Sequence, residues 1–269
     1  MDTSASGKLF KELLKMVFNK FEVKDLEKFR TFSSAVEYYT QYIFQQDKII
    51  DNDINWSVDR ENVKNSTLYL SHQFHQSAIK LLSNVFPDNH DFWPFLQQKE
   101  LQYFQRICTE KHLSIQKEDM SITAFEDLAV GKHILSIVPI YAMFHLGSSS
   151  LEYAKVEQIF SKIFCAIQML DDFDDFDRDL KDGQWTYLQS EVLRTINVEE
   201  LVREESIPDL EKRVLYAADL AQYALEYSQR KFESAKLLAV EQDLTEIVLW
   251  LDAMIDETKR QQEFILSLT

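Results

Sequence analysis

Seven aspartates lie within the twelve residues from Asp171 to Asp182, directly after an apolar run that contains no helix breaker. An α-helix turns about 100° per residue, so carboxylates that recur every fourth residue share one face. The residues predicted to share this face are Gln168, Asp171, Asp172, Asp175, Asp179 and Asp182. Asp174 and Asp177 fall on another side of the same helix. The sequence therefore concentrates carboxylates on one helix face, which helices normally avoid.

This concentration of like charge has an energetic cost. Six aspartate pairs lie at i,i+3 or i,i+4 spacing, and at ~0.2–0.5 kcal/mol each they sum to roughly 1–3 kcal/mol. Favourable pairs of Arg178 and Lys181 with nearby aspartates offset part of this repulsion. A polyvalent cation removes the repulsion, and ligand sets made only of oxygen suit a hard ion such as Mg²⁺. An ordinary solvated acidic face is the alternative. The regular repeat favours a Mg²⁺ site with four ligands: Asp171, Asp172, Asp175 and Asp179.

The aspartate motif resembles those of known enzymes. Gln168-x2-Asp171-Asp172-x2-Asp175-x3-Asp179 resembles the second aspartate-rich motif, F-Q-x-x-D-D-x-x-D, of trans-isoprenyl diphosphate synthases. The longer frame to Gly183 resembles the second motif of squalene and phytoene synthases. Upstream, the segment that begins at Lys132 reads K-H-I-L and resembles the K-T-x-L segment of prenyl synthases, whose lysine contacts diphosphate. The resemblance covers residues 126–190 and points to the class I isoprenoid synthases.

The resemblance implies an enzyme that ionises an allylic prenyl diphosphate. Mg²⁺ held by the catalytic carboxylates Asp171 and Asp175 would neutralise the charge that builds on diphosphate as its C–O bond breaks. Three polar residues are expected to contact the diphosphate: Lys132, Gln168 and Lys181. The remaining carbocation needs a dry apolar pocket. Three aromatic residues near the motif are candidates to line it: Tyr141, Phe144 and Phe164.

The same families carry a first aspartate-rich motif well upstream of the second. Asp47 and Asp51 lie at i,i+4 spacing near the end of a predicted helix, and we predict that they are further metal ligands. The alternative is an ordinary acidic helix end. This segment lacks the paired aspartates of D-D-x-x-D, and no paired arginines follow it. These differences favour a terpene synthase (a cyclase) over an elongating prenyl diphosphate synthase or a squalene/phytoene synthase-like enzyme. Outside enzymes, the alternative is a non-catalytic prenyl-diphosphate-binding or regulatory subunit.

Composition indicates one all-α domain, a helical bundle spanning residues 1–269. The chain has only four glycines and four prolines, and its apolar content of 45% is enough for a large core. A net charge of −16 argues against nucleic acid and anionic membrane surfaces as partners, because both require a basic patch. The two cysteines, Cys108 and Cys165, show neither metal-ligand spacing nor a disulfide framework.

The sequence predicts a soluble cytoplasmic protein without integral membrane association. The first residues lack a basic stretch followed by an apolar one, so no signal peptide is expected. The most apolar segment, Ile134 to Phe144, is too short to span a bilayer and contains Pro139. A homodimer is compatible with these features.

Apolar periodicity predicts a series of helices. Their predicted bounds are 8–21, 33–50, 66–84, 91–108, 121–146, 187–196, 210–237 and 243–268, together with the aspartate helix. Gly131 and Pro139 are expected to interrupt the helix over 121–146. Gly183 is expected to end the aspartate helix as a C-cap.

Overall fold

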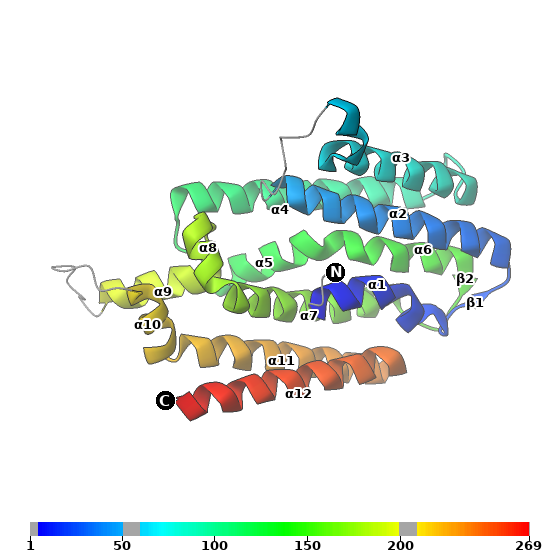
Figure 1. The fold of residues 1–269 in the computed structure, drawn as a ribbon. Coiled ribbons are helices and arrows are strands. Elements are labelled where there is room, and N and C mark those ends of the chain that lie inside the picture. Colours follow the sequence, from blue (N-terminus) through cyan, green and yellow to red (C-terminus); the bar gives the residue numbers. More distant parts are fainter. Residues whose placement is uncertain (1–4, 51–59, 199–208, 269) are drawn as a thin grey trace.

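The computed structural model describes residues 5–50, 60–198 and 209–268. Within these ranges the chain is almost entirely helical, which confirms the predicted all-α class. Two-residue strands β1 (Glu22–Val23) and β2 (Gly147–Ser148) pair antiparallel, with Glu22 opposite Ser148. This short ladder joins two loops at one end of the molecule (Figure 1).

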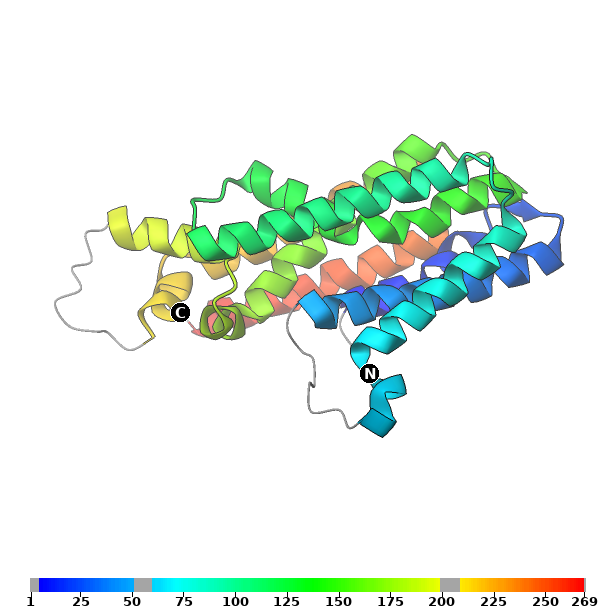
Figure 2. The same cartoon turned by 90° about the horizontal axis from the view of Figure 1, so that it is seen from above.

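The helices form an elongated bundle (Figures 1 and 2). The first half contains α1 (Ala5–Phe18), α2 (Leu26–Ile50), the 3₁₀ turn η1 (Arg60–Asn65), α3 (Thr67–Val85) and α4 (Phe92–Gln116). The middle contains α5 (Ile122–His133), the 3₁₀ turn η2 (Ile134–Ile137), α6 (Val138–Leu146), α7 (Tyr153–Asp174) and α8 (Phe176–Asp182). The rest contains α9 (Tyr187–Val198), α10 (Leu210–Ala217), α11 (Leu220–Glu241) and α12 (Thr245–Leu268). The most extensive helix contacts join α2 to α3, α7 to α11 and α11 to α12.

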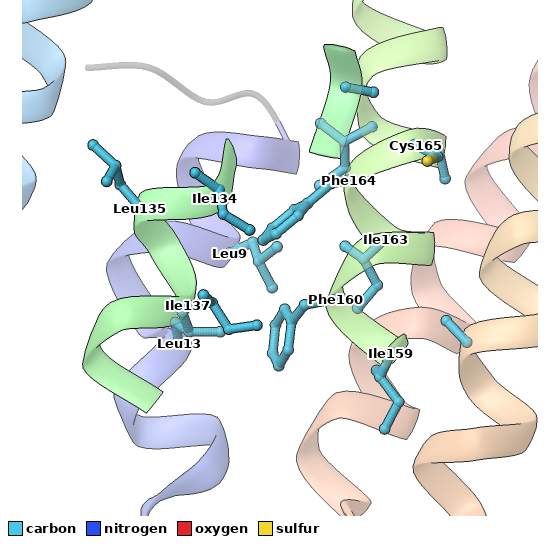
Figure 3. Packing of buried hydrophobic residues seen from close by; sticks show 14 of the residues in the cluster. Leu9, Leu13, Ile134, Leu135, Ile137, Ile159, Phe160, Ile163, Phe164 and Cys165 are labelled. Carbon is cyan, nitrogen blue, oxygen red and sulfur yellow. The ribbon is translucent and has the colours of Figure 1, made fainter. Parts of the chain in front are cut away.

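Helix α7 runs through the core. Every residue from Ile163 to Leu170 is buried, as expected for a helix that is apolar around most of its circumference. Phe160 and Phe164 point toward α1 and η2, whereas Cys165 faces away from them (Figure 3). This packing fixes the direction in which α7 enters the aspartate motif at its C-terminal end.

Helix interruptions occur partly where the sequence predicts them. The helix over 121–146 gives way to 3₁₀ geometry after His133, and Pro139 lies in the first turn of α6, as expected from Gly131 and Pro139. Gly183 ends α8 with φ of 73°, the left-handed C-cap predicted for it. The single helix predicted over 210–237 is wrong, because Asp219 adopts φ of 57° and separates α10 from α11.

One helical stretch of the described chain, Ile122–Leu146, is long and apolar enough to cross a membrane by length and composition. It is longer than the apolar segment from Ile134 to Phe144 considered above, because α5, η2 and α6 follow one another without a loop. Its most apolar window has a mean hydropathy of 1.3 and is 61% buried inside the bundle. A buried core helix meets the same criterion, so this stretch is weak evidence for a membrane span.

Candidate active site

A cavity of about 730 Å³ opens beside the aspartate motif. Helices α1, α2, α4, α5, α7 and α8 and the turn η2 all contribute to its wall. Seven of the residues predicted to bind metal or diphosphate line it: Asp47, Lys132, Gln168, Asp171, Asp172, Asp175 and Asp179. Asp182, from the predicted acidic face, lines it as well. Asp47 comes from α2, in a different layer of the bundle from α7 (Figure 1). The fold thus brings the two predicted acidic segments to one cavity.

Other predicted residues lie elsewhere. Lys181 is exposed on α8 and does not line the cavity, and Asp51 falls outside the described residues. The prediction that Tyr141, Phe144 and Phe164 line the cavity is wrong. Phe164 is 1% exposed in the core, and Tyr141 stacks on Phe95 with ring centroids 3.6 Å apart.

The aspartate motif forms two helices instead of one. Asp175 has φ of −94° and ψ of 3°, which ends α7 and starts α8. The Asp175 carbonyl oxygen accepts hydrogen bonds from the N–H groups of Arg178 and Asp179. Helix α8 then turns steeply away from α7 and crosses the end of the bundle toward α4 (Figure 1). Asp179 therefore approaches the cavity from a different direction than Asp171, although both still line it.

Asp172 and Asp179 are the two buried carboxylates of the motif, with 6% and 5% of their surfaces exposed. The Nε2 atom of Gln168 donates a hydrogen bond of 2.7 Å to Asp172 Oδ1. Burial raises the pKa of Asp172 to about 7, although Lys132 and the Gln168 hydrogen bond act in the opposite direction. Asp172 is therefore a partly protonated acid near neutral pH, held by Gln168.

Lys132 faces the same buried acids from α5. Its Nζ atom lies 2.7 Å from Oε1 of Glu110 on α4. Glu110 also lines the cavity and was missed by the sequence analysis. The next residue, His133, is half-buried, and desolvation of its ring lowers the pKa of the ring to about 3, so the ring is neutral. Lys132, with its side chain 21% exposed, is thus the positive charge that α5 brings to this wall.

A second cation lies at the α7–α8 junction. Arg178 on α8 pairs with Asp175 through Nη2, and its Nε atom is 4.0 Å from Asp179 Oδ1. Burial raises the pKa of Asp179 to about 6, and the neighbouring charge of Asp175 adds to this shift. Arg178 itself is 66% exposed. The negative charge at the α7–α8 junction is therefore partly offset by an arginine that remains open to solvent.

The far part of the cavity is mostly apolar. Its lining there includes Leu13, Leu14, Val36, Tyr39, Ile43, Phe44, Leu135 and Pro139, with Thr40 and Ser136 as polar residues among them. Val36 and Asp47 are eleven residues apart on α2, which separates them by ~16 Å along the helix axis. The Tyr103 hydroxyl donates a hydrogen bond of 3.0 Å to Asp47 Oδ1 and holds that carboxylate at the cavity wall. One elongated cavity therefore joins a carboxylate-rich part to an apolar part.

The acidic wall is not a preformed metal centre. Over residues 5–50, 60–198 and 209–268, no group of three or more Asp, Glu, His or Cys side chains is arranged to hold a metal ion. Mg²⁺ keeps several waters and binds through one or two carboxylates plus substrate phosphates. The oxygen donors of Asp171 and Asp175 fit that more limited requirement, because both border the cavity and neither is fully buried.

No protein-family model matches the chain, and no curated protein matches its sequence. The resemblance to class I isoprenoid synthases therefore depends on the aspartate motif, the lysine segment and their chemistry.

Proposed function

We propose that the protein is a Mg²⁺-dependent class I isoprenoid synthase that ionises an allylic prenyl diphosphate. The observation that carries this proposal is the two-part cavity, with carboxylates at the α7–α8 junction and apolar side chains along α1, α2 and η2. A prenyl diphosphate has the same division between a highly charged head and a long apolar chain. The volume of about 730 Å³ is within the range of sites for small organic ligands.

The charge of the wall explains why such a substrate requires a metal. Asp47, Glu110, Asp171, Asp172 and Asp175 all border the cavity, and a diphosphate alone would be repelled by them. Bound Mg²⁺ supplies the positive charge that both the carboxylates and the departing diphosphate require. On this proposal Asp171 and Asp175 hold the metal, with Asp179 and Asp47 as further oxygen donors.

The protein's own cations have a separate role. Lys132 is fixed by Glu110 on the side of the cavity next to Asp172, so a positive charge is already oriented before substrate arrives. A pre-oriented charge stabilises the charge that develops on the leaving group without reorganisation. Lys132 therefore binds the diphosphate, and Gln168, already bonded to Asp172, keeps the carboxylate network in place.

The apolar part excludes water from the carbocation. Tyr39, Phe44 and Tyr103 are the aromatic side chains that line the cavity in the described chain, and their rings stabilise a nearby cation electrostatically. Water that reached the carbocation would quench it, so an apolar lining is a chemical requirement of the reaction. These residues replace the aromatic set expected from the sequence.

Cyclisation is preferred over chain elongation. Asp47 is followed by Lys48, Ile49 and Ile50 instead of a paired aspartate, so the first motif of elongating enzymes is incomplete here. A terpene synthase acts on one allylic substrate and does not need to position a second one. A non-catalytic diphosphate-binding subunit is the second candidate, because no preformed metal group exists among the described residues.

Incubation with single prenyl diphosphates tests the proposal. Purified protein receives geranyl, farnesyl or geranylgeranyl diphosphate with Mg²⁺ or with EDTA, and released diphosphate and hydrocarbon products are measured. Mg²⁺-dependent products from one substrate alone support a terpene synthase. Products that require added isopentenyl diphosphate indicate an elongating enzyme. Diphosphate binding without turnover indicates the non-catalytic subunit, and neither binding nor turnover overturns the proposal.

A further inference from the structure

Arg178 occupies a defined position between two carboxylates of the motif. It pairs with Asp175, at the end of α7, and approaches Asp179, one turn further along α8. Asp179 is 8% exposed and Asp175 is 36% exposed, so the arginine reaches from solvent toward a partly buried acidic pair. All three residues line the cavity.

This contact has a consequence for metal binding. A guanidinium group binds carboxylates strongly because its N–H groups and its charge both match their oxygens. Mg²⁺ needs direct contact with carboxylate oxygen and has strict geometric requirements. While Arg178 donates to this oxygen of Asp175, the oxygen binds a metal ion less strongly. Likewise, a metal ion bound to the oxygen weakens its hydrogen bond with the arginine. The two cations therefore compete for one carboxylate.

We propose that Arg178 is an internal counter-ion that occupies the α7–α8 junction in the metal-free protein and must leave Asp175 before Mg²⁺ binds there. The inference rests on the proposed function, because it concerns the same carboxylates. It accounts for the absence of a preformed three-ligand group among the described residues. It also gives the acidic junction a stable metal-free form, because Arg178 offsets the repulsion between Asp175 and Asp179. The exposed side chain of Arg178 has room in solvent to move aside.

The chain provides a matched control for this charge. Lys212 on α10 pairs with Asp177, which lies on α8 but does not line the cavity. Arg178→Gln and Lys212→Gln each remove one positive charge that pairs with an α8-region aspartate. Both variants therefore change the net charge equally, and only Arg178→Gln frees a carboxylate at the cavity. Arg178→Lys keeps the charge at the cavity.

Isothermal titration with MgCl₂, alone and then with inorganic diphosphate, measures the competition. Exposed ion pairs contribute ~0.2–1 kcal/mol, so we expect the Mg²⁺ Kd of Arg178→Gln to be about 1.4- to fivefold lower than that of the wild type. Lys212→Gln and Arg178→Lys should keep the wild-type Kd. In EDTA, the Tm of Arg178→Gln should be below that of the wild type, and Mg²⁺ should raise it by more than it raises the wild-type Tm.

Three results would overturn the inference. An unchanged or weaker Mg²⁺ affinity in Arg178→Gln would show that the arginine does not compete with the metal. An equal gain in Mg²⁺ affinity in Lys212→Gln would assign the effect to net charge. An equal gain in Mg²⁺ affinity in Arg178→Lys would exclude the charge of Arg178 as its cause. These results leave the proposed function standing. Undetectable Mg²⁺ binding in both the wild type and Arg178→Gln, with and without diphosphate, overturns this inference and the metal-dependent function together.

Discussion

The Nζ atom of Lys132 on α5 lies 2.7 Å from Oε1 of Glu110 on α4, at the wall of the cavity. The side chains are only 21% and 11% exposed, respectively. Each charge therefore depends on the other, because a partly buried ion without a partner loses much of its solvation. The pair also joins two helices whose relative position sets the width of the site.

Lys132→Ala is expected to destabilise the protein by about 2 kcal/mol, less than the ~3–5 kcal/mol for breaking a fully buried pair, because some solvent reaches both groups. Glu110 would keep its charge without a counter-ion. Urea denaturation measures the free energy of unfolding. Lys155→Ala is the control, because Lys155 and Glu241 form a longer, more exposed pair at 3.8 Å and its loss should cost less than ~0.5 kcal/mol. An equal loss in both variants would contradict the assigned role of the Lys132 pair.

The sequence predicted those parts of the site that depend on local chemistry. The four-residue aspartate repeat, Pro139 and Gly183 each act over one or two helical turns, so their effects can be read directly from spacing. The acidic face was predicted on one straight helix, and the break at Asp175 changed its geometry but kept Asp171, Asp175 and Asp179 on one cavity.

Features that depend on packing between distant segments were missed. Glu110 looks like any other acid on a long polar helix, and its burial follows only from the approach of α5 to α4. Phe164 is close to the motif in sequence, but its ring packs in the core. Tyr141 is only partly buried, and its ring stacks on Phe95 outside the cavity. The break at Asp219 contains no glycine or proline, so nothing in the local sequence marks it.

The raised pKa of Asp172 predicts a pH-dependent stability. Burial moves this pKa from 3.8 to about 7 in the folded protein, so between these values the folded state binds a proton that the unfolded state has lost. The contribution of Asp172 to stability is therefore present below pH ~4 and falls as the pH rises toward 7.

Asp172→Asn removes this titration while keeping a side chain of the same shape. The difference in unfolding free energy, wild type minus variant, should fall with rising pH across that window by a few kcal/mol, since each pKa unit corresponds to ~1.4 kcal/mol. Urea denaturation of both proteins in EDTA at several pH values measures it. The titration of His133 occurs in both proteins and cancels in the difference. A difference that does not change with pH would contradict the buried, partly protonated state of Asp172.

Gly131 controls how closely α5 approaches α4. A Cβ atom at position 131 would lie 2.0 Å from Cγ and 2.8 Å from Cβ of Arg106. These atoms are near the arginine backbone and cannot move aside by a rotation at the end of the side chain. Gly131→Ala should therefore cost ~1–3 kcal/mol through overpacking, although alanine is the better helix former.

Thermal unfolding in EDTA tests this packing effect. In the Arg106→Ala background, the same Gly131→Ala change should cost less, because the Cγ atom at 2.0 Å is gone and only the contact with Cβ at 2.8 Å remains. The double-mutant cycle separates this coupling from the loss of the Arg106–Asp127 ion pair. An additive double mutant would show that the close contact does not limit the approach of the two helices.

The last prediction separates a Mg²⁺ site from an acidic surface. Binding of Mg²⁺ and inorganic diphosphate to the native wild type should raise its stability by linkage, about 2.7 kcal/mol at a hundred times the dissociation constant. Asp171→Asn should abolish this stabilisation and the turnover of prenyl diphosphate. It should leave the metal-free protein as stable or slightly more stable, because it removes like-charge pairs in the motif.

Asp177→Asn is the matched control, because Asp177 lies in the same acidic run, pairs with Lys212 and does not line the cavity. It should retain both turnover and the stabilisation by Mg²⁺ and diphosphate, while the loss of its exposed ion pair costs at most ~1 kcal/mol. Thermal shift assays in EDTA and in Mg²⁺ with diphosphate, run beside product assays, compare the two variants. Because the variants have the same net charge, equal losses at Asp171 and Asp177 would mean that general acidity, and not a carboxylate at the cavity wall, accounts for the effect. Loss at Asp171 alone would assign metal binding to the cavity side of the motif.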